Sequence, residues 1–240
     1  MATFVLVHGA WHGAWCWSRV MPALRAAAQH DVFAVTLTGV GERAHLLSRD
    51  ITLDTHVTDV VNLITCEELD DVVLVGHSYG GLPITGAADR LLARRPGLLK
   101  HVVYIDAVVP HPGECWATHH DAELVARRVA ESAAHPQGAL PPPDAALYGL
   151  TGADCEWVNR RQLPHPFGQY REALHFDAAR LAALPRTFID CVSPAWPSIA
   201  PMRRRVRNEP GWHVREIATG HDAMVSAPGP LTRMLLETAA

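Results

Sequence analysis

The sequence predicts an α/β fold: a mostly parallel sheet of about six strands flanked by helices, with a helical cap inserted between the fourth and fifth strands. Short apolar runs rich in β-branched residues alternate with helical patterns along most of the 240 residues. A Gly-x-Ser-x-Gly pentapeptide separates one such run from a helical stretch. The alternation is interrupted once, at about residues 110–184, which are rich in Pro, His and Ala and form the predicted cap.

Composition and charge predict one soluble globular domain over residues 1–240 and exclude several classes of function. Hydrophobic residues make up 48% of the chain and charged residues 19%. The net charge of −4 comes without a basic run, so we expect no nucleic-acid partner. No apolar run is long enough for a membrane span, and the N-terminus lacks the features of a signal peptide. We therefore expect a cytoplasmic protein without a membrane partner, and a homodimer is left open.

The cysteines, histidines and arginines form no pattern of a metal, redox or phosphate site. The five cysteines are odd in number and scattered without a Cys-x-x-Cys, which favours free thiols. The adjacent His119 and His120 have no further ligand at a spacing typical of zinc sites. We therefore predict neither a metal nor a cofactor. The densest cationic stretch, residues 203–205, is expected to be the solvated face of a helix.

The chain begins with a strand, a loop and a helix. Residues 3–7 are apolar and β-rich, as expected for a buried strand, and the glycine-containing loop 8–13 follows. Residues 17–29 place Val20 and Leu24 on one face of a helix. This helix carries a proline only in its early turns, where a missing N–H costs little.

Two further strands enclose an amphipathic helix. Residues 31–37 form the second strand, and residues 72–75 form the third, directly before the pentapeptide. Thr52 or Asp54 can cap the N-terminus of the helix between them. The helix is marked by an apolar stripe at positions i, i+3, i+4 and i+7: Val57, Val60, Val61 and Ile64.

The alternation continues after the pentapeptide and resumes after the cap. A helix at 79–95 ends before Pro96-Gly97, and a fourth strand at 101–106 ends on Asp106. Within the cap, residues 121–134 and 177–184 have helical patterns. The remaining elements are two strands and a closing helix, at residues 186–191, 212–218 and 230–238.

The pentapeptide Gly76-His77-Ser78-Tyr79-Gly80 predicts a nucleophile elbow. A strand, a sharp turn and a helix are the context in which this motif exposes a serine above a sheet edge, and glycines allow the strand and helix to pass closely. Ser78 is then the nucleophile. The backbone N–H of Tyr79, together with one near Ala10 in the loop after the first strand, can form an oxyanion hole.

A serine hydroxyl needs a general base within hydrogen-bond reach. Hydrolases with this elbow place the residues in the chain order Ser, acid, His. His221 lies in the loop after the last predicted strand, where this order requires the base. We therefore predict His221 as the general base.

Several segments together resemble an α/β-hydrolase, of the subgroup that contains plant methylesterases, hydroxynitrile lyases and bacterial pyrethroid-type carboxylesterases. They span nearly the whole chain apart from the cap: Val7-His8-Gly9-Ala10, His12-Gly13-Ala14-Trp15, Leu37-Thr38-Gly39-Val40-Gly41-Glu42-Arg43, Gly76 to Gly81, Tyr104-Ile105-Asp106-Ala107 and Gly220-His221 with Met224. The resemblance implies the α/β-hydrolase fold and a serine hydrolase acting on a small-molecule ester, and it does not specify the substrate.

The acid of the triad is where the sequence departs from these relatives. They carry it just past the fifth strand, but here the corresponding residues are Cys191-Val192-Ser193-Pro194, which include no carboxylate. Asp106, at the carboxyl end of the strand after the elbow, and Asp190, inside the fifth strand, are the two replacements. We favour Asp106, because a carboxylate at that edge can reach the imidazole, whereas Asp190 can point into the packing between sheet and helices.

The prediction is therefore ester hydrolysis by Ser78, His221 and Asp106 through an acyl-enzyme, with a hydrophobic substrate. Aromatic and histidine side chains are expected to line the pocket: Trp11, His12, Trp116, Trp157 and Tyr170. An amidase or lactonase would use the same residues. A hydroxynitrile lyase is disfavoured because such lyases carry threonine where Gly9 stands and lysine where Asp222 stands. A non-catalytic receptor on this fold is the remaining alternative.

Overall fold

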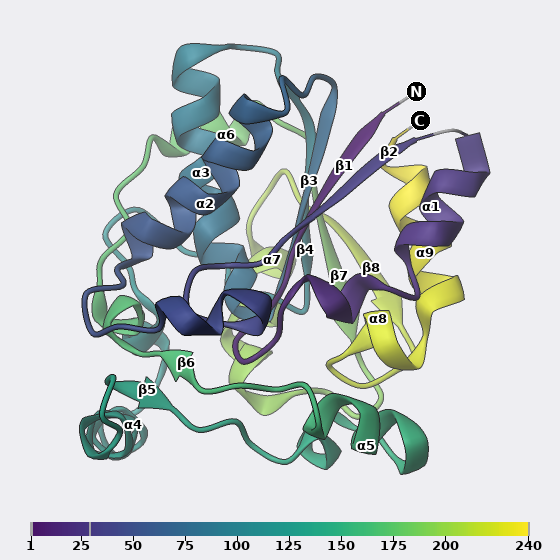
Figure 1. Ribbon diagram of the computed structural model, residues 1–240. Coiled ribbons are helices and arrows are strands. Elements are labelled where there is room, and N and C mark those ends of the chain that lie inside the picture. Colours follow the sequence, from purple (N-terminus) through teal and green to yellow (C-terminus); the bar gives the residue numbers. More distant parts are fainter. Residues whose placement is uncertain (1, 29, 240) are drawn as a thin grey trace.

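Six strands form one twisted parallel sheet at the centre of the protein (Figure 1). The computed structural model describes residues 2–28 and 30–239; positions 1, 29 and 240, which the predicted domain and its first helix include, lie outside the described residues. The strand order is β2-β1-β3-β4-β7-β8, and every neighbouring pair is parallel. The strands are β1 (Thr3–Val7), β2 (Asp31–Val35), β3 (Val72–His77), β4 (Leu99–Ile105), β7 (Arg186–Cys191) and β8 (His213–Ile217).

Alternate side chains of the central strands enter two separate cores, one on each face of the sheet. In β1, Val5 and Val7 belong to one core, while Phe4 and Leu6 belong to the other. The same alternation runs through β3 and β4. Because both faces are covered, β1 and β3 are almost continuously apolar in sequence, as is typical of buried parallel sheets.

Helices cover both faces of the sheet, so the predicted fold class is confirmed. On the first face lie α2 (Leu53–Cys66), α3 (Gly81–Arg94), α6 (Ala178–Ala182) and α7 (Ala200–Asn208). On the second face lie α1 (Met21–Ala28), α8 (Ala223–Ser226) and α9 (Pro228–Glu237). No helix in residues 2–28 and 30–239 combines the length and the apolar character needed to cross a bilayer.

The ends of several helices differ from the sequence prediction for local reasons. The first helix begins at Met21 rather than residue 17, because residues 14–17 form a separate 3-10 turn. Residues 78–80 are likewise a 3-10 turn, so α3 begins at Gly81. Of the two candidate N-terminal capping residues, Thr52 caps α2: its hydroxyl accepts from the Thr55 N–H at 3.1 Å.

The cap lies beyond the carboxyl ends of the strands and is not purely helical (Figure 1). It contains α4 (Ala122–Ala134), α5 (Gly152–Asn159) and a short antiparallel pair, β5 (Ala139–Leu140) with β6 (His165–Pro166). The two-residue strands are too short to show alternation, and α5 buries only Val158, so neither leaves a periodic signal. The helix predicted near residues 177–184 leaves the cap and packs against α3 as α6.

Candidate active site

Ser78 lies in a sharp turn that only closely packed glycines permit. It follows β3 directly, and its φ of 53° is in the left-handed region. A Cβ atom on Gly80 would lie 2.7 Å from the carbonyl oxygen of His8 and 2.9 Å from that of Val7. A Cβ atom on Gly76 would lie 2.8 Å from the carbonyl oxygen of Gly80. The backbone therefore holds the serine in a strained conformation with its hydroxyl at the sheet edge.

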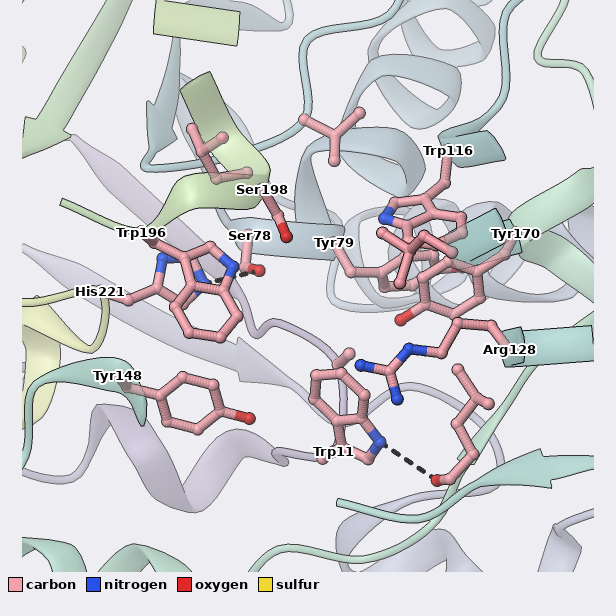
Figure 2. A pocket seen from close by; sticks show the side chains of 15 residues that line it. Trp11, Ser78, Tyr79, Trp116, Arg128, Tyr148, Tyr170, Trp196, Ser198 and His221 are labelled. Atoms are coloured by element: carbon pink, nitrogen blue, oxygen red, sulfur yellow. Dashed lines mark hydrogen bonds between the residues drawn. The ribbon is translucent and has the colours of Figure 1, made fainter. Parts of the chain in front are cut away.

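Ser78, His221 and Asp106 form a continuous chain of hydrogen bonds from three different loops. The Nε2 atom of His221 lies 2.9 Å from Oγ of Ser78 (Figure 2). The Nδ1 atom of the same ring lies 2.6 Å from Oδ2 of Asp106. Asp106 is fully buried and His221 is nearly so. Because a carboxylate only accepts, Nδ1 of His221 carries the proton, which leaves Nε2 free to accept from the serine hydroxyl.

The second candidate acid, Asp190, forms ion pairs with two arginines and not with His221. Its carboxylate accepts from Nε of Arg203, and its other oxygen lies 2.7 Å from Nη2 of Arg207. Arg203 also donates from Nη2 to Oδ1 of Asp106 at 2.5 Å, so one guanidinium bridges the two aspartates. The structure thus places Asp106, rather than Asp190, beside His221.

Arg203 and Arg205 correct the expectation of a solvated helix face. They leave 12% and 13% of their side chains exposed, and Arg205 pairs with Glu114 at 2.6 Å. Only Arg204 between them is exposed. Arg203 and Arg205, which flank the exposed Arg204, are largely buried because their acidic partners lie at the strand ends and in the cap.

His221 is held by its backbone as well as by its ring. Its N–H donates to the carbonyl oxygen of Tyr148 at 2.9 Å, and its own carbonyl accepts from Nε2 of His77 at 3.0 Å. The ring stacks on Trp196, with centroids 5.3 Å apart. A Cβ atom on Gly220 would lie 2.2 Å from the carbonyl oxygen of Tyr148, so the loop and the cap pack without space between them.

The loop after β1 is fixed by histidines at two successive peptide groups. His8 donates from Nδ1 to the carbonyl of Gly9 at 2.7 Å and accepts at Nε2 from the Leu37 N–H. Burial lowers the pKa of His8 to about 3, so the ring is neutral. Since C=O and N–H point to opposite sides of a trans peptide, the N–H of Ala10 is directed away from His8. Ala10 and Tyr79 both line the cavity with Ser78.

His12 fixes the next peptide and forms an ion pair inside the protein. Its Nδ1 lies 2.7 Å from the carbonyl oxygen of Ala10, and its Nε2 lies 3.0 Å from Oδ2 of Asp222. Both partners only accept, so both ring nitrogens carry protons. Burial alone would lower the pKa of His12, but the Asp222 carboxylate raises it above the ordinary value. Likewise, burial would raise the pKa of Asp222, but His12 holds it at about 2.

A cavity of about 90 Å³ opens beside Ser78 and His221 (Figure 2). Of the aromatic residues predicted to line it, Trp11, Trp116 and Tyr170 do so. His12 and Trp157 are not among its lining residues. His12 stacks on Trp15 behind the loop. Trp157, on α5, packs against the guanidinium groups of Arg19 and Arg161.

Other residues of the cavity wall carry no sequence signal that identifies them. They come from the cap, from the loop after β4 and from the segment before α7: Val108, Leu124, Arg128, Leu140, Tyr148, Trp196, Ser198 and Ile199. Trp11, in the loop after β1, joins this loop to the cap, because its Nε1 donates to the carbonyl oxygen of Leu140 at 3.1 Å. The cavity is therefore walled jointly by the cap and the edge of the sheet.

The side chain of Tyr79 points away from the reacting atoms and anchors the elbow. Its hydroxyl donates to Nδ1 of His56 at 2.9 Å, while Nε2 of His56 donates to the carbonyl of Thr38. Burial lowers the pKa of His56 to about 4 and raises that of Tyr79 well above the ordinary value, so both groups are neutral. In the described part of the chain, no group of three or more His, Cys, Asp or Glu side chains is placed to hold a metal ion.

Comparison with known proteins agrees with this architecture. The model of the alpha/beta hydrolase family matches residues 4–233. A carbendazim hydrolyzing esterase from Nocardioides sp. (strain SG-4G) is 39% identical over 246 residues, which cover 98% of each protein. Methylesterase 2 from Arabidopsis thaliana is 37% identical over 131 residues, or 54% of this chain and 46% of its own length.

Solved structures share the fold over the full length. An extracellular alpha/beta-hydrolase from a Paenibacillus species superimposes with a TM-score of 0.84 at 21% identity, covering 99% of both chains. The resemblance predicted from the sequence segments is confirmed by these matches. The chain belongs to the alpha/beta hydrolase family, as an enzyme of the esterase type.

Proposed function

We propose that the protein hydrolyses carboxylic esters of small hydrophobic substrates through an acyl-enzyme, with Ser78, His221 and Asp106 as its catalytic triad. One observation carries the proposal: an unbroken hydrogen-bond chain from a buried carboxylate to a serine hydroxyl that borders a cavity. The esterases among its relatives support the same reaction class.

In the first half of the reaction, Ser78 Oγ attacks the ester carbonyl carbon. Nε2 of His221, 2.9 Å away, takes the hydroxyl proton and then delivers it to the departing alcohol. Asp106 accepts from Nδ1–H of His221, which fixes the tautomer and stabilises the imidazolium that forms. In the second half, a water molecule repeats the attack on the acyl-enzyme, with His221 again acting as the base.

The tetrahedral oxyanion is stabilised by the N–H groups of Ala10 and Tyr79. The Gly9–Ala10 peptide is oriented by His8, and the Tyr79 N–H belongs to the first turn after the elbow, where helical N–H groups have no intrahelical partner. One such donor is typically worth about 3 kcal/mol of transition-state stabilisation. No movement of these groups is required, because the loops that carry them are fixed by buried hydrogen bonds.

The geometry also weighs against a hydroxynitrile lyase. A Cβ atom at position 9 would lie 2.9 Å from Cβ of Ser78 and 2.8 Å from Nδ1 of His77, so threonine does not fit here without displacing the elbow. The lysine that a lyase carries at position 222 is replaced here by Asp222, an anion that pairs with His12. The same residues could also hydrolyse an amide or a lactone. Hydrolysis of these compounds differs from ester hydrolysis only in the leaving group.

The proposal is tested by hydrolysis of p-nitrophenyl esters of graded acyl length, with Ser78→Ala beside the wild type. Carbendazim is included because of the relative that is named for its hydrolysis. We expect turnover of short esters, a burst of p-nitrophenol that reports the acyl-enzyme, and a loss of activity in Ser78→Ala. Wild-type protein that turns over none of these compounds, or Ser78→Ala protein that retains full activity, would contradict it.

A further inference from the structure

The cap brings one permanently charged side chain to the cavity, that of Arg128 on α4. Figure 2 shows its guanidinium directed into the cavity that Ser78 and His221 also border. We propose that Arg128 binds a carboxylate at the end of the substrate remote from the ester, so that the preferred substrates are half-esters of diacids or acylated hydroxy acids. This inference rests on the proposed ester hydrolysis and specifies its substrate class.

The positive charge has no anionic counterpart inside the cavity. No Asp or Glu is present among the described residues that line it. Three tyrosines line the cavity, Tyr79, Tyr148 and Tyr170, and burial raises the pKa of each hydroxyl well above the ordinary value, so all three stay neutral. The guanidinium therefore faces no acidic side chain on the cavity side, where a ligand carboxylate would pair with it in addition to its contact with Glu131 on the same helix.

The guanidinium also keeps hydrogen-bonding capacity. Its Nη1 donates to Oε2 of Glu131 at 2.8 Å, one turn along the same helix. Within residues 2–28 and 30–239, this is the one hydrogen bond that the guanidinium of Arg128 makes to the protein. An arginine has five N–H donors in a planar fork that matches a carboxylate, so Nε and Nη2 are available to a ligand.

The surroundings of Arg128 strengthen such a contact. The wall beside it is aromatic, with Trp11, Trp116 and Tyr170, and its own side chain is only 27% exposed. In a site of low polarity a charge-assisted hydrogen bond is worth more than at the open surface. The cavity of about 90 Å³ is small, so the chain between the ester and the carboxylate must be short.

The test compares esters that differ only in charge. Monomethyl glutarate is matched with the ester in which an isopropyl group replaces the carboxylate, and the acetate ester of gamma-hydroxybutyrate is matched in the same way for the alcohol side. The kcat/KM ratio of charged to uncharged ester is measured for the wild type and for Arg128→Met, Arg128→Lys and Glu131→Gln. Arg127→Met is the control, because Arg127 lies next in the chain but is 57% exposed.

We expect the wild type to prefer the charged member of at least one pair. Arg128→Met should lower kcat/KM for the charged ester about 10- to 100-fold more than kcat/KM for the uncharged ester, mainly through KM. Arg128→Lys should retain part of the preference, Glu131→Gln should increase it, and Arg127→Met should leave it unchanged.

Three outcomes would overturn the inference. They are equal turnover of charged and uncharged esters by the wild type, an equal loss for both in Arg128→Met, and the same change in Arg127→Met. Each leaves the proposed esterase reaction standing, because the uncharged esters are still hydrolysed. Failure of the wild type on every ester, p-nitrophenyl esters included, would instead refute the proposed function.

Discussion

His12 and Asp222 form an ion pair, 3.0 Å from Nε2 to Oδ2, that leaves 2% and 0% of the two side chains exposed. The pair joins the loop after β1, which carries Ala10, to the loop that carries His221. Two parts of the site that lie more than two hundred residues apart in sequence are thus linked by one buried contact. The pair explains why Asp222, adjacent to the proposed base, orients another histidine rather than its own neighbour.

Asp222→Asn should destabilise the protein and weaken catalysis together. The substitution leaves a buried imidazolium without its counter-charge, which typically costs about 3–5 kcal/mol. Without the carboxylate, His12 would lose a proton. The hydrogen bond from its ring to the Ala10 carbonyl oxygen would then be weaker, because a neutral ring is a weaker donor. The unfolding free energy in urea checks the loss of stability. The kcat of the folded variant, measured without urea, checks the loss of catalysis.

The matched control for this pair is Asp154→Asn. Asp154 pairs with Arg19 at 2.8 Å, but both side chains are about one-third exposed. We expect the loss of this pair to cost less than about 1 kcal/mol, with no change in kcat. Equal unfolding free energies for the two variants would show that the His12–Asp222 pair has no special role.

Asp106→Asn and Asp190→Asn should separate the two candidate acids. An amide at position 106 can donate to the imidazole and favour the wrong tautomer, so kcat should fall about 10,000-fold. Asp190→Asn removes partners of Arg203 and Arg207 and should lower stability, but the bond between His221 and Asp106 stays in place. We expect its turnover to fall less than about tenfold. A collapse of activity in Asp190→Asn with little effect in Asp106→Asn would overturn the proposed triad.

Gly9→Ala should reduce turnover by moving the nucleophile. The added methyl group would lie 2.9 Å from Cβ of Ser78, closer than such atoms pack, so the elbow or the loop must shift. Overpacking of this kind typically costs about 1–3 kcal/mol. Gly229→Ala is the control, because a Cβ atom there would meet only the end of Arg233 at 3.9 Å. Full activity in Gly9→Ala would show that the loop is not held as tightly as these contacts imply.

Buried histidines should make the protein sensitive to acid. Burial lowers the pKa of His8 to about 3 and that of His56 to about 4, and holds those of His77 and His165 well below the ordinary 6.5. In the unfolded chain these rings take up protons below about pH 6.5, whereas the folded protein keeps them neutral. The stability that depends on these four neutral rings is therefore fully present above about pH 6.5 and is lost as the pH falls toward about 4 and 3.

Each such histidine contributes a slope of about 1.4 kcal/mol per pH unit, so the four together give roughly 5 kcal/mol per pH unit below their ordinary pKa. Unfolding free energies in urea, measured between about pH 7 and about pH 5, check this slope. His56→Gln should remove roughly a quarter of it. A stability that stays flat across this interval would contradict the neutral, buried state of these rings.

The sheet, and the meeting of Ser78, His221 and Asp106 at its edge, were predictable because their signals are local. Strands such as Thr3–Val7 and Val72–His77 contain runs of four apolar residues, and the elbow carries its own pentapeptide. His221 followed from its place after the last strand. Asp106 could be favoured because it ends a strand at the same edge as Ser78.

The rest of the site depends on contacts between residues distant in sequence. The sequence alone places Arg203 on an exposed helix face, because its partners Asp106 and Asp190 belong to other elements and precede it by 97 and 13 residues. His12 was expected in the cavity, although its partner on the far side of the loop, Asp222, turns it inward. Tyr148 and Trp196 reach the cavity from irregular segments, where no periodic pattern shows which way a side chain points.

The bond from the His221 N–H to the Tyr148 carbonyl has a consequence for engineering the cap. Tyr148 belongs to the cap, so exchange of the whole insertion between relatives would remove a backbone anchor of the proposed base. A chimera designed to change specificity should therefore replace α4 and the β5–β6 pair and retain the turn at Ala145–Tyr148. The insertion is thus divided into a portion that can be redesigned for new ligands and a portion that must stay constant.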